Sequence, residues 1–291
     1  MSFAIFTDGC SNLPGRLLRE LDIHVLPCTY TVNGEPVTFS GDIEQFDAKA
    51  YYDQLRAGMD IKTSLLNTQL FMDHFRPCLE QGLDVLYVGL SSGVSGTYQA
   101  SCMAAEELME EFPGRTVRTV DSRGASLGVG ILTCRGADFR AEGMDVNAAA
   151  DALLEESDHL CQYFTVDDLN FLKRGGRCSP SAAFFGSMLS IKPVLHVSCE
   201  GKLVAREKVR GRKQALKALA AKFGELEAQK GQWVFISHGD CESDALVVKH
   251  HLVDMYGCDP DKIVLSFVGP VIGSHAGPGV VALFFRGKDR G

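Results

Sequence analysis

Along the first half of the chain, apolar residues occur in two patterns: short continuous runs and helical spacing. Short apolar runs, typical of buried strands, occupy residues 3–7, 23–30, 85–88 and 116–120. Stretches in which apolar residues recur at helical spacing occupy residues 16–21, 42–59, 68–79, 97–111 and 125–141. Because strands and helices follow one another in turn, the pattern predicts βαβ units and a mainly parallel sheet.

The pattern changes at about residue 145. The next expected elements are a helix over 145–160 and a short strand over 162–166. Apolar runs at 195–198 and 203–207 are joined by the polar segment 199–202, which predicts a hairpin and therefore antiparallel pairing. A helix and three more strands are then expected, over 209–228, 233–237, 262–268 and 280–285.

These two patterns indicate two domains, an N-terminal α/β domain over residues 1–160 and a C-terminal α+β domain over residues 161–291. No stretch rich in proline and serine separates them, so we expect them to pack together.

Composition narrows the class of protein. The chain has 291 residues, of which 45% are hydrophobic, enough to build a core. It carries 29 Lys and Arg against 37 Asp and Glu, and this acidic balance argues against a general nucleic-acid binder. The N-terminal sequence MSFAIFTDGC lacks the features of a signal peptide, and no apolar run reaches the length of a membrane span. We therefore expect a cytoplasmic protein with no transmembrane segment.

The ten cysteines do not form a sequence motif, because no two lie within four residues of each other. We expect reduced thiols that pack as small hydrophobic side chains. Asp8 and Asp121 each follow a strand, and we expect no cluster of His or Cys partners around these carboxylates. No metal site and no cofactor are predicted, and helix capping is the favoured role for these two aspartates.

The segment 85–100, VLYVGLSSGVSGTYQA, is the most informative for chemistry. A strand leads through a loop of glycines and hydroxyl residues into a helix, a place where backbone N–H groups favour an anion. One interpretation is an anion-binding cup with Ser92, Ser95 or Thr97 as donors. Another is a nucleophile elbow of a serine hydrolase, because residues 89–93 match G-x-S-x-G with Ser91 in the centre. An ordinary loop is the third.

Histidines and hydroxyls elsewhere add candidates to both interpretations. His275 lies in a segment, 269–279, whose glycines and prolines predict a rigid loop. Its imidazole could bind a carboxylate or act as the base of a hydrolase, with Asp240 as the acid and His238 as a competitor. The pair Thr63 and Ser64 precedes a predicted helix, where capping is the commoner role.

Basic residues gather at 173–177 and again within 206–213, which indicates either a solvated face or a docking surface for an anionic partner. The chain has no G-x-x-x-x-G-K-[ST] and no G-x-G-x-x-G motif, so we predict no ATP or NAD binding.

Seven segments, taken together and in order, resemble the DegV family. They are FTDGCSNLP, Thr63-Ser64, LSSGVSGTY, VDSRGASLG, DDLNFLKRGGR with SIKPVL, KVRGRKQAL and GPVIGSHAGPG. The family consists of bacterial proteins that bind a fatty acid and serve a fatty acid kinase. The resemblance implies an α/β fold of two domains: an N-terminal three-layer α/β/α domain with a parallel sheet, and a C-terminal two-layer α/β domain with a mixed sheet. The ligand would lie between them.

The resemblance also implies roles for individual residues. A long-chain fatty acid would be held through its carboxylate by Thr63, Ser95 and His275, and Ser91 would be a loop residue. Further ligand candidates are Ser92, Thr97 and Ser274. The protein would not be an enzyme. It would present the carboxyl group to an ATP-dependent kinase subunit, which makes the acyl phosphate for phospholipid synthesis.

The kinase would dock against Arg174, Arg177 and Arg210, and any membrane contact would be transient. The apolar segment 182–189 is a candidate wall of the lipid tunnel. The chain departs from the usual family pattern at Gly9-Cys10, where a serine is common, and at Leu65-Leu66-Asn67, where a proline is common.

Overall fold

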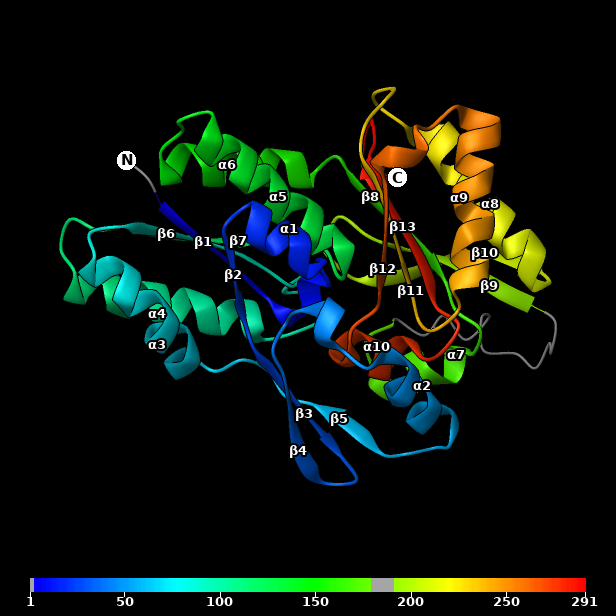
Figure 1. Cartoon of the computed structure of the whole chain (residues 1–291), viewed down its shortest axis with the longest axis horizontal. Helices are drawn as coiled ribbons and strands as arrows, with labels where there is room; N and C mark the ends of the chain where they lie inside the picture. Colours follow the sequence, from blue (N-terminus) through cyan, green and yellow to red (C-terminus); the bar gives the residue numbers. More distant parts are fainter. Residues whose placement is uncertain (1–2, 179–190) are drawn as a thin grey trace.

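The computed structural model describes residues 3–178 and 191–291, and within these the strands form three sheets (Figure 1). Sheet A is four-stranded and parallel, in the order β2-β1-β6-β7. Its strands are β1 (Phe3–Asp8), β2 (Ile23–Leu26), β6 (Asp84–Gly89) and β7 (Val117–Asp121). The short helix α1 (Gly15–Glu20) connects β1 to β2.

Helices cover both faces of sheet A. The alternation of side chains along β1 sends Ala4 and Phe6 to one face and Phe3 and Ile5 to the other. The first face packs on α3 (Thr68–Glu80) and α4 (Thr97–Glu111), and the second on α5 (Leu127–Ala141) and α6 (Val146–Ser157). Figure 1 shows these two helix pairs on opposite sides of the sheet. This arrangement is the expected three-layer α/β/α unit.

Sheet C is six-stranded and mixed, in the order β10-β9-β8-β13-β11-β12. Among its described strand pairs, only β11 and β12 are parallel. The strands are β8 (Leu160–Thr165), β9 (Ile191–Val197), β10 (Leu203–Arg210), β11 (Val234–His238), β12 (Ile263–Phe267) and β13 (Val281–Arg286). Helices α8 (Arg212–Leu226) and α9 (Glu242–Tyr256) pack on one face. The predicted two-layer α/β architecture with a mixed sheet is confirmed.

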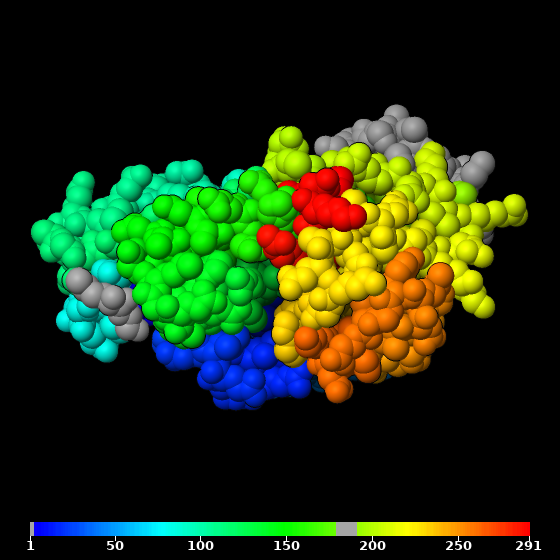
Figure 2. Space-filling view, turned by 90° about the horizontal axis from the view of Figure 1, so that it is seen from above, coloured from blue at the N-terminus to red at the C-terminus, as the bar shows by residue number. Residues whose placement is uncertain are grey.

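The other face of sheet C packs against the first unit. Phe164, Phe235 and Phe284 of sheet C belong to the same apolar cluster as Leu132 of α5 and Ile5 of β1. Figure 2 shows the segments drawn blue to green on one side and those drawn yellow to orange on the other. We retain residues 1–160 and 161–291 as the proposed domains, since the last strand of sheet A ends at Asp121 and the first strand of sheet C, Leu160–Thr165, lies at the proposed boundary to within one residue.

Sheet B is a small antiparallel sheet that the sequence pattern does not predict. It contains β3 (Cys28–Val32), β4 (Glu35–Phe39) and β5 (Ile61–Thr63), and α2 (Ala48–Arg56) packs against it. The single strand expected over 23–30 is wrong: Pro27 lies between β2 and β3, which pair in different sheets, because proline has no N–H for a ladder. The helix expected over 42–59 is shorter, since Asp47 caps α2 by accepting from the N–H of Ala50.

The segment 269–279 is also not the loop that its glycines and prolines predict. It contains the helix α10 (Pro270–Ala276), with Pro270 in the first turn, where its missing N–H has no helical partner to lose. Gly277 ends the helix with φ of +78°. A further short helix, α7 (Leu169–Gly175), lies beside α10. His275 is therefore presented from the last turn of a helix.

Two remaining expectations concern membranes and the lipid tunnel. Within the described part of the chain, every helix is too short or too polar to span a bilayer. The proposed tunnel wall at 182–189 lies outside the described residues.

Candidate functional site

A cavity of about 430 Å³ opens at the carboxyl edge of sheet A, between the loops that follow β1, β2 and β6 and the helix α10. Ligands commonly bind at this edge of parallel sheets. Its lining combines thiol, hydroxyl, imidazole and apolar side chains, among them Asp8, Cys10, Cys28, Thr63, Ser64, Leu66, Ser92, Ser95, Thr97, Arg177, Val271, Ile272 and His275.

Thr63 and His275 form the polar centre of this cavity. Thr63 ends β5, where it pairs with Tyr30 of β3, and its Oγ1 lies 2.9 Å from Nε2 of His275. Burial, and secondarily the positive charge of Arg177, lower the pKa of His275 to about 4. The imidazole is therefore neutral at pH 7, and it can offer a hydrogen bond to a bound group without carrying a charge itself.

Ser95 and Thr97 lie together at the start of α4. The Ser95 hydroxyl donates to Thr97 Oγ1 over 3.0 Å and accepts from the Thr97 N–H over 3.2 Å. Thr97 Oγ1 in turn accepts from the N–H of Leu66, which ties the loop after β5 to this helix. Because the start of a helix carries a partial positive charge, these hydroxyls stand where an anion is favoured.

Of the remaining ligand candidates, Ser92 lines the cavity and Ser274 does not. The backbone N–H of Ser92 donates to Asp121 Oδ1 over 3.2 Å. Ser274 donates its hydroxyl to the carbonyl of Val271 over 2.9 Å and is not among the described residues that line the cavity. The structure thus brings Thr63, Ser95 and His275 to one cavity and leaves Ser274 outside it.

Ser91 lies in the loop expected to form either a nucleophile elbow or a binding cup. Its buried hydroxyl donates to the carbonyl of Gly201 over 2.9 Å and accepts from the N–H of Gly93 over 3.0 Å. The loop and the β9–β10 turn approach so closely that a Cβ on Gly93 would lie 2.6 Å from the carbonyl oxygen of Glu200. Ser91 therefore joins two loops.

Asp240, His238 and His275, the candidate triad partners of Ser91, each contact other residues. Asp240 pairs with Arg56 over 2.5 Å, and His238 Nδ1 accepts from the N–H of Cys241 over 3.4 Å. His275 contacts Thr63 through Nε2. These contacts do not assemble the Ser-His-Asp arrangement that a hydrolase requires.

Of the three arginines expected at a docking surface, one also borders the cavity. Arg177 is exposed and lines the mouth beside His275. Arg174 is exposed on α7 with its guanidinium 4.6 Å from the ring centre of Phe171, and Arg210 is exposed at the end of β10. Arg177 is thus placed to act on a bound anion as well as on a partner.

A smaller cavity of about 70 Å³, lined mainly by apolar side chains but also by Ser126, Gln162 and Ser237, continues from the first one. The two share Ala125, Leu203, Ile272 and His275 as lining residues. The continuation runs along the face of sheet C that packs on the first unit, between side chains such as Phe164, Leu172, Val197, Val268 and Phe284. Sequence reasoning missed it, because these residues come from separate elements and each has the ordinary pattern of a core position.

Asp8 is bordered by two cysteines that the sequence analysis did not connect with it. Donor atoms of Asp8, Cys10 and Cys28 all lie within 4.8 Å of one another. A hydrogen bond with Cys28, burial and the Asp8 carboxylate raise the pKa of the Cys10 thiol well above its usual value. The expectation that Asp8 lacks a clustered Cys partner is therefore wrong: Cys10 is only two residues away in the sequence, and the pairing of β1 with β2 brings Cys28 beside both.

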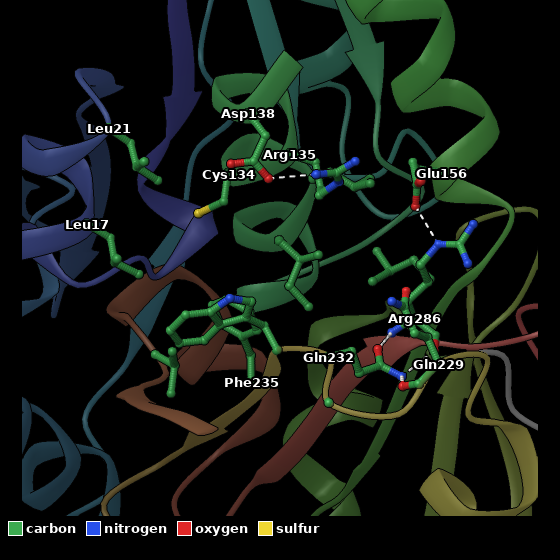
Figure 3. A pocket seen from close by; sticks show the side chains of 16 residues that line it. Leu17, Leu21, Cys134, Arg135, Asp138, Glu156, Gln229, Gln232, Phe235 and Arg286 are labelled. Carbon is green, nitrogen blue, oxygen red and sulfur yellow. Dashed lines mark hydrogen bonds and ion pairs between the residues drawn. The ribbon is translucent and has the colours of Figure 1, made fainter. Parts of the chain in front are cut away.

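A third cavity, of about 740 Å³, lies between the two units and away from these residues (Figure 3). Leu17 and Leu21 of α1 and Phe235 of β11 are among its apolar lining residues. Its rim holds two ion pairs, Arg135 with Asp138 over 2.7 Å and Arg286 with Glu156 over 2.8 Å. Among residues 3–178 and 191–291, none of the site residues predicted from the sequence lines this cavity.

Known proteins similar to this chain match it over nearly its whole length. A family model described as "Uncharacterised protein, DegV family" matches residues 2–288. A DegV domain-containing protein of Clostridium perfringens is 40% identical over 293 residues, covering 99% of this chain and 98% of the relative.

Solved structures agree with this match. A fatty-acid-binding DegV family protein from Thermus thermophilus superposes with a TM-score of 0.88 at 29% identity, covering 99% of this chain and 100% of that one. A fatty-acid-binding DegV family protein from Streptococcus agalactiae gives a TM-score of 0.86 at 30% identity, with the same coverage. With its fold and the motifs around its cavity in agreement, the chain belongs to the DegV family.

Proposed function

We propose that this chain binds one long-chain fatty acid, with the carboxylate at Thr63, Ser95 and His275 in the 430 Å³ cavity and the acyl chain along the apolar side chains of that cavity and of its continuation. The observation that carries the proposal is that a cavity containing the hydroxyl and imidazole groups of Thr63, Ser95 and His275 joins a second, mainly apolar cavity through four shared lining residues. An amphipathic ligand with one polar end matches such a lining. The similar proteins from Thermus thermophilus and Streptococcus agalactiae, described as binding fatty acids, support the same ligand class.

Thr63, Ser95 and His275 are the proposed carboxylate ligands. The Thr63 and Ser95 hydroxyls can each turn a proton toward a carboxylate, and the neutral His275 can donate from one ring nitrogen. The start of α4 and the exposed Arg177 add positive potential at the same end of the cavity. Ser92 and Thr97 are supporting candidates because they line the same cavity, whereas the position of Ser274 gives its candidacy no support.

The acyl chain supplies most of the binding free energy. Burying a chain of 16–18 carbons at about 0.8 kcal/mol per methylene gives roughly 12 kcal/mol before the costs of ordering and association. A ligand held this strongly would survive purification. Denaturing the purified protein and analysing an organic extract by mass spectrometry tests the proposal: we expect one fatty acid per chain, and an extract without stoichiometric lipid would overturn it.

We further propose that the protein acts as a carrier for an ATP-dependent fatty acid kinase, which would form the acyl phosphate for phospholipid synthesis. The chain has no phosphate-binding loop motif, so the ATP site would belong to the partner. The exposed Arg174, Arg177 and Arg210 suit an acidic partner surface. The contacts of Ser91 with Gly201 and Gly93 give no support to the alternative of a serine hydrolase.

A further inference from the structure

The carboxyl edge of sheet A places two cysteines side by side. Strands β1 and β2 are parallel neighbours, and Asp8 and Leu26 form their last pair. Cys10 and Cys28 each stand two residues beyond that pair, so the register carries them to the same edge. Both side chains are buried, with 4% and 3% of their surface exposed, and both line the 430 Å³ cavity.

Asp8 completes a group of three donor atoms. Its carboxylate and the two sulfurs all lie within 4.8 Å of one another, and in residues 3–178 and 191–291 no other His, Cys, Asp or Glu side chains form such a group. Ligands of a tetrahedral zinc ion are about 3.8 Å apart at a Zn–S distance of about 2.3 Å. The widest separation present would therefore need to close by about 1 Å at most.

Two hydrogen bonds fix the orientation of the Asp8 carboxylate. The Tyr87 hydroxyl donates to Oδ2 over 2.6 Å, and the backbone N–H of Cys10 donates to Oδ1 over 2.8 Å. A carboxylate oxygen has two lone pairs, so Oδ1 keeps one for a further bond. Hydrogen bonds of this kind orient carboxylate ligands in metal sites.

We propose that Asp8, Cys10 and Cys28 form a binding site for Zn²⁺, with the fourth coordination position facing the cavity. Two thiolates and one carboxylate suit zinc, whereas Mg²⁺ and Ca²⁺ require oxygen ligands alone. Binding would replace the two thiol protons by one divalent ion, with both protons released to solvent. The buried charge of the group would stay at that of the single Asp8 carboxylate, so the exchange adds no net charge to the interior.

The test uses the full chain, freed of metal by a chelator and kept reduced with a phosphine. Titration with ZnCl₂ against a chromophoric chelator measures stoichiometry and affinity, and CoCl₂ reports thiolate ligation through its ultraviolet charge-transfer band. We expect one zinc per chain and a cobalt band of the intensity given by two thiolates. Cys10→Ser and Cys28→Ser should each weaken zinc binding by at least about 10-fold.

Cys199→Ser is the matched control, because Cys199 is an exposed cysteine of the same chain. Its zinc affinity should equal that of the wild type. The cobalt band of the wild-type chain decides the question even where a ligand variant fails to fold. A wild-type chain without that band, or equal zinc binding when both ligand cysteines are replaced, overturns the site. Lipid extracted from the same sample is measured separately, so either proposal can fail without the other.

Discussion

Thr63 and His275 are 212 residues apart in the chain, and their side chains meet at 2.9 Å on the wall of the polar cavity. One comes from the last position of β5 and the other from the last turn of α10. The two elements belong to distant parts of the sequence, so the carboxylate site we propose exists only once the whole chain has folded.

Removing either side chain should weaken fatty acid binding. Hydrogen bonds to a charged group contribute about 1.5–3 kcal/mol, so Thr63→Val and His275→Ala should each raise the dissociation constant about 10–100-fold. Binding of a fluorescent fatty acid to delipidated protein measures this. Thr38 and His74 do not line the cavity. The control variants Thr38→Val and His74→Ala should therefore bind the fatty acid as tightly as the wild type does. Wild-type affinity in both site variants would remove the head-group assignment.

The two serine candidates can be separated by a matched pair. Ser95→Ala should weaken fatty acid binding, and it should also lower the free energy of unfolding by about 1 kcal/mol because it removes an acceptor for the Thr97 N–H. Ser274→Ala should leave lipid affinity unchanged, since its hydroxyl bonds the carbonyl of Val271. Fluorescent fatty acid titration and urea unfolding of both variants give the two readouts. Reduced affinity in Ser274→Ala alone would reverse the assignment.

Acid should destabilise the protein through His275. Its pKa is about 4 when folded, against an ordinary value of 6.5, so the unfolded chain takes up a proton at a higher pH than the folded chain does. The stabilising effect of the neutral imidazole is complete above pH 6.5 and is lost as the pH falls toward 4, by up to about 3 kcal/mol. In urea unfolding at pH 7, 6, 5 and 4.5, His275→Gln should lose less stability than the wild type. Parallel curves would contradict this prediction.

Ser91 should behave as a structural serine. We expect no labelling of Ser91 by a fluorophosphonate probe, because its hydroxyl proton is donated to the Gly201 carbonyl. Ser91→Ala should retain bound lipid and lose about 1–2 kcal/mol of stability, since the Gly201 carbonyl and the Gly93 N–H lose their partner. Mass spectrometry of the probe-treated protein would locate any adduct, and a label on Ser91 would revive the hydrolase.

Arg174 and Arg210 should matter for a kinase partner and not for the lipid. With a fatty acid kinase subunit and ATP, Arg174→Glu and Arg210→Glu should each slow acyl phosphate formation several-fold by reversing a charge at the docking surface. Their lipid content should match the wild type, because neither residue lines the cavity. Lys217→Glu makes the same change of charge at an exposed position of α8 and serves as the control. An equal loss of acyl phosphate formation in all three variants would indicate an effect of net charge and would contradict docking at Arg174 and Arg210.

The spacing of apolar residues predicted much of the fold, because this spacing follows from the geometry of helices and strands. The helix expected over 97–111 begins and ends as predicted, at Thr97 and Glu111, since its start is marked by glycine and hydroxyl residues and its apolar positions keep helical spacing. The break between β2 and β3 and the helix α10 were not predicted from the sequence. Pro27 ends a strand whereas Pro270 begins a helix, and the residue type alone does not distinguish these two roles.

The candidate site was predicted only where a residue stood in a motif. Ser95 and His275 were already candidates from their glycine-rich surroundings, and the family resemblance added Thr63 and combined the three; the structure brings them to one cavity. The approach of Cys28 to Cys10 and the apolar continuation along sheet C depend on which strands and helices become neighbours. Such pairings between distant segments leave no mark on the local pattern of apolar and polar residues.

The chain's single tryptophan gives it a built-in optical probe. Trp233 is 55% exposed and lines the 740 Å³ cavity, between helices of the first unit and strands of sheet C, and it does not line the cavity of Thr63 and His275. Emission excited selectively from this indole therefore reports the spacing of the two units from a place that the proposed lipid does not touch. A loaded and an empty protein that differ in this emission would differ in the surroundings of this indole, at a cavity that the proposed lipid does not occupy.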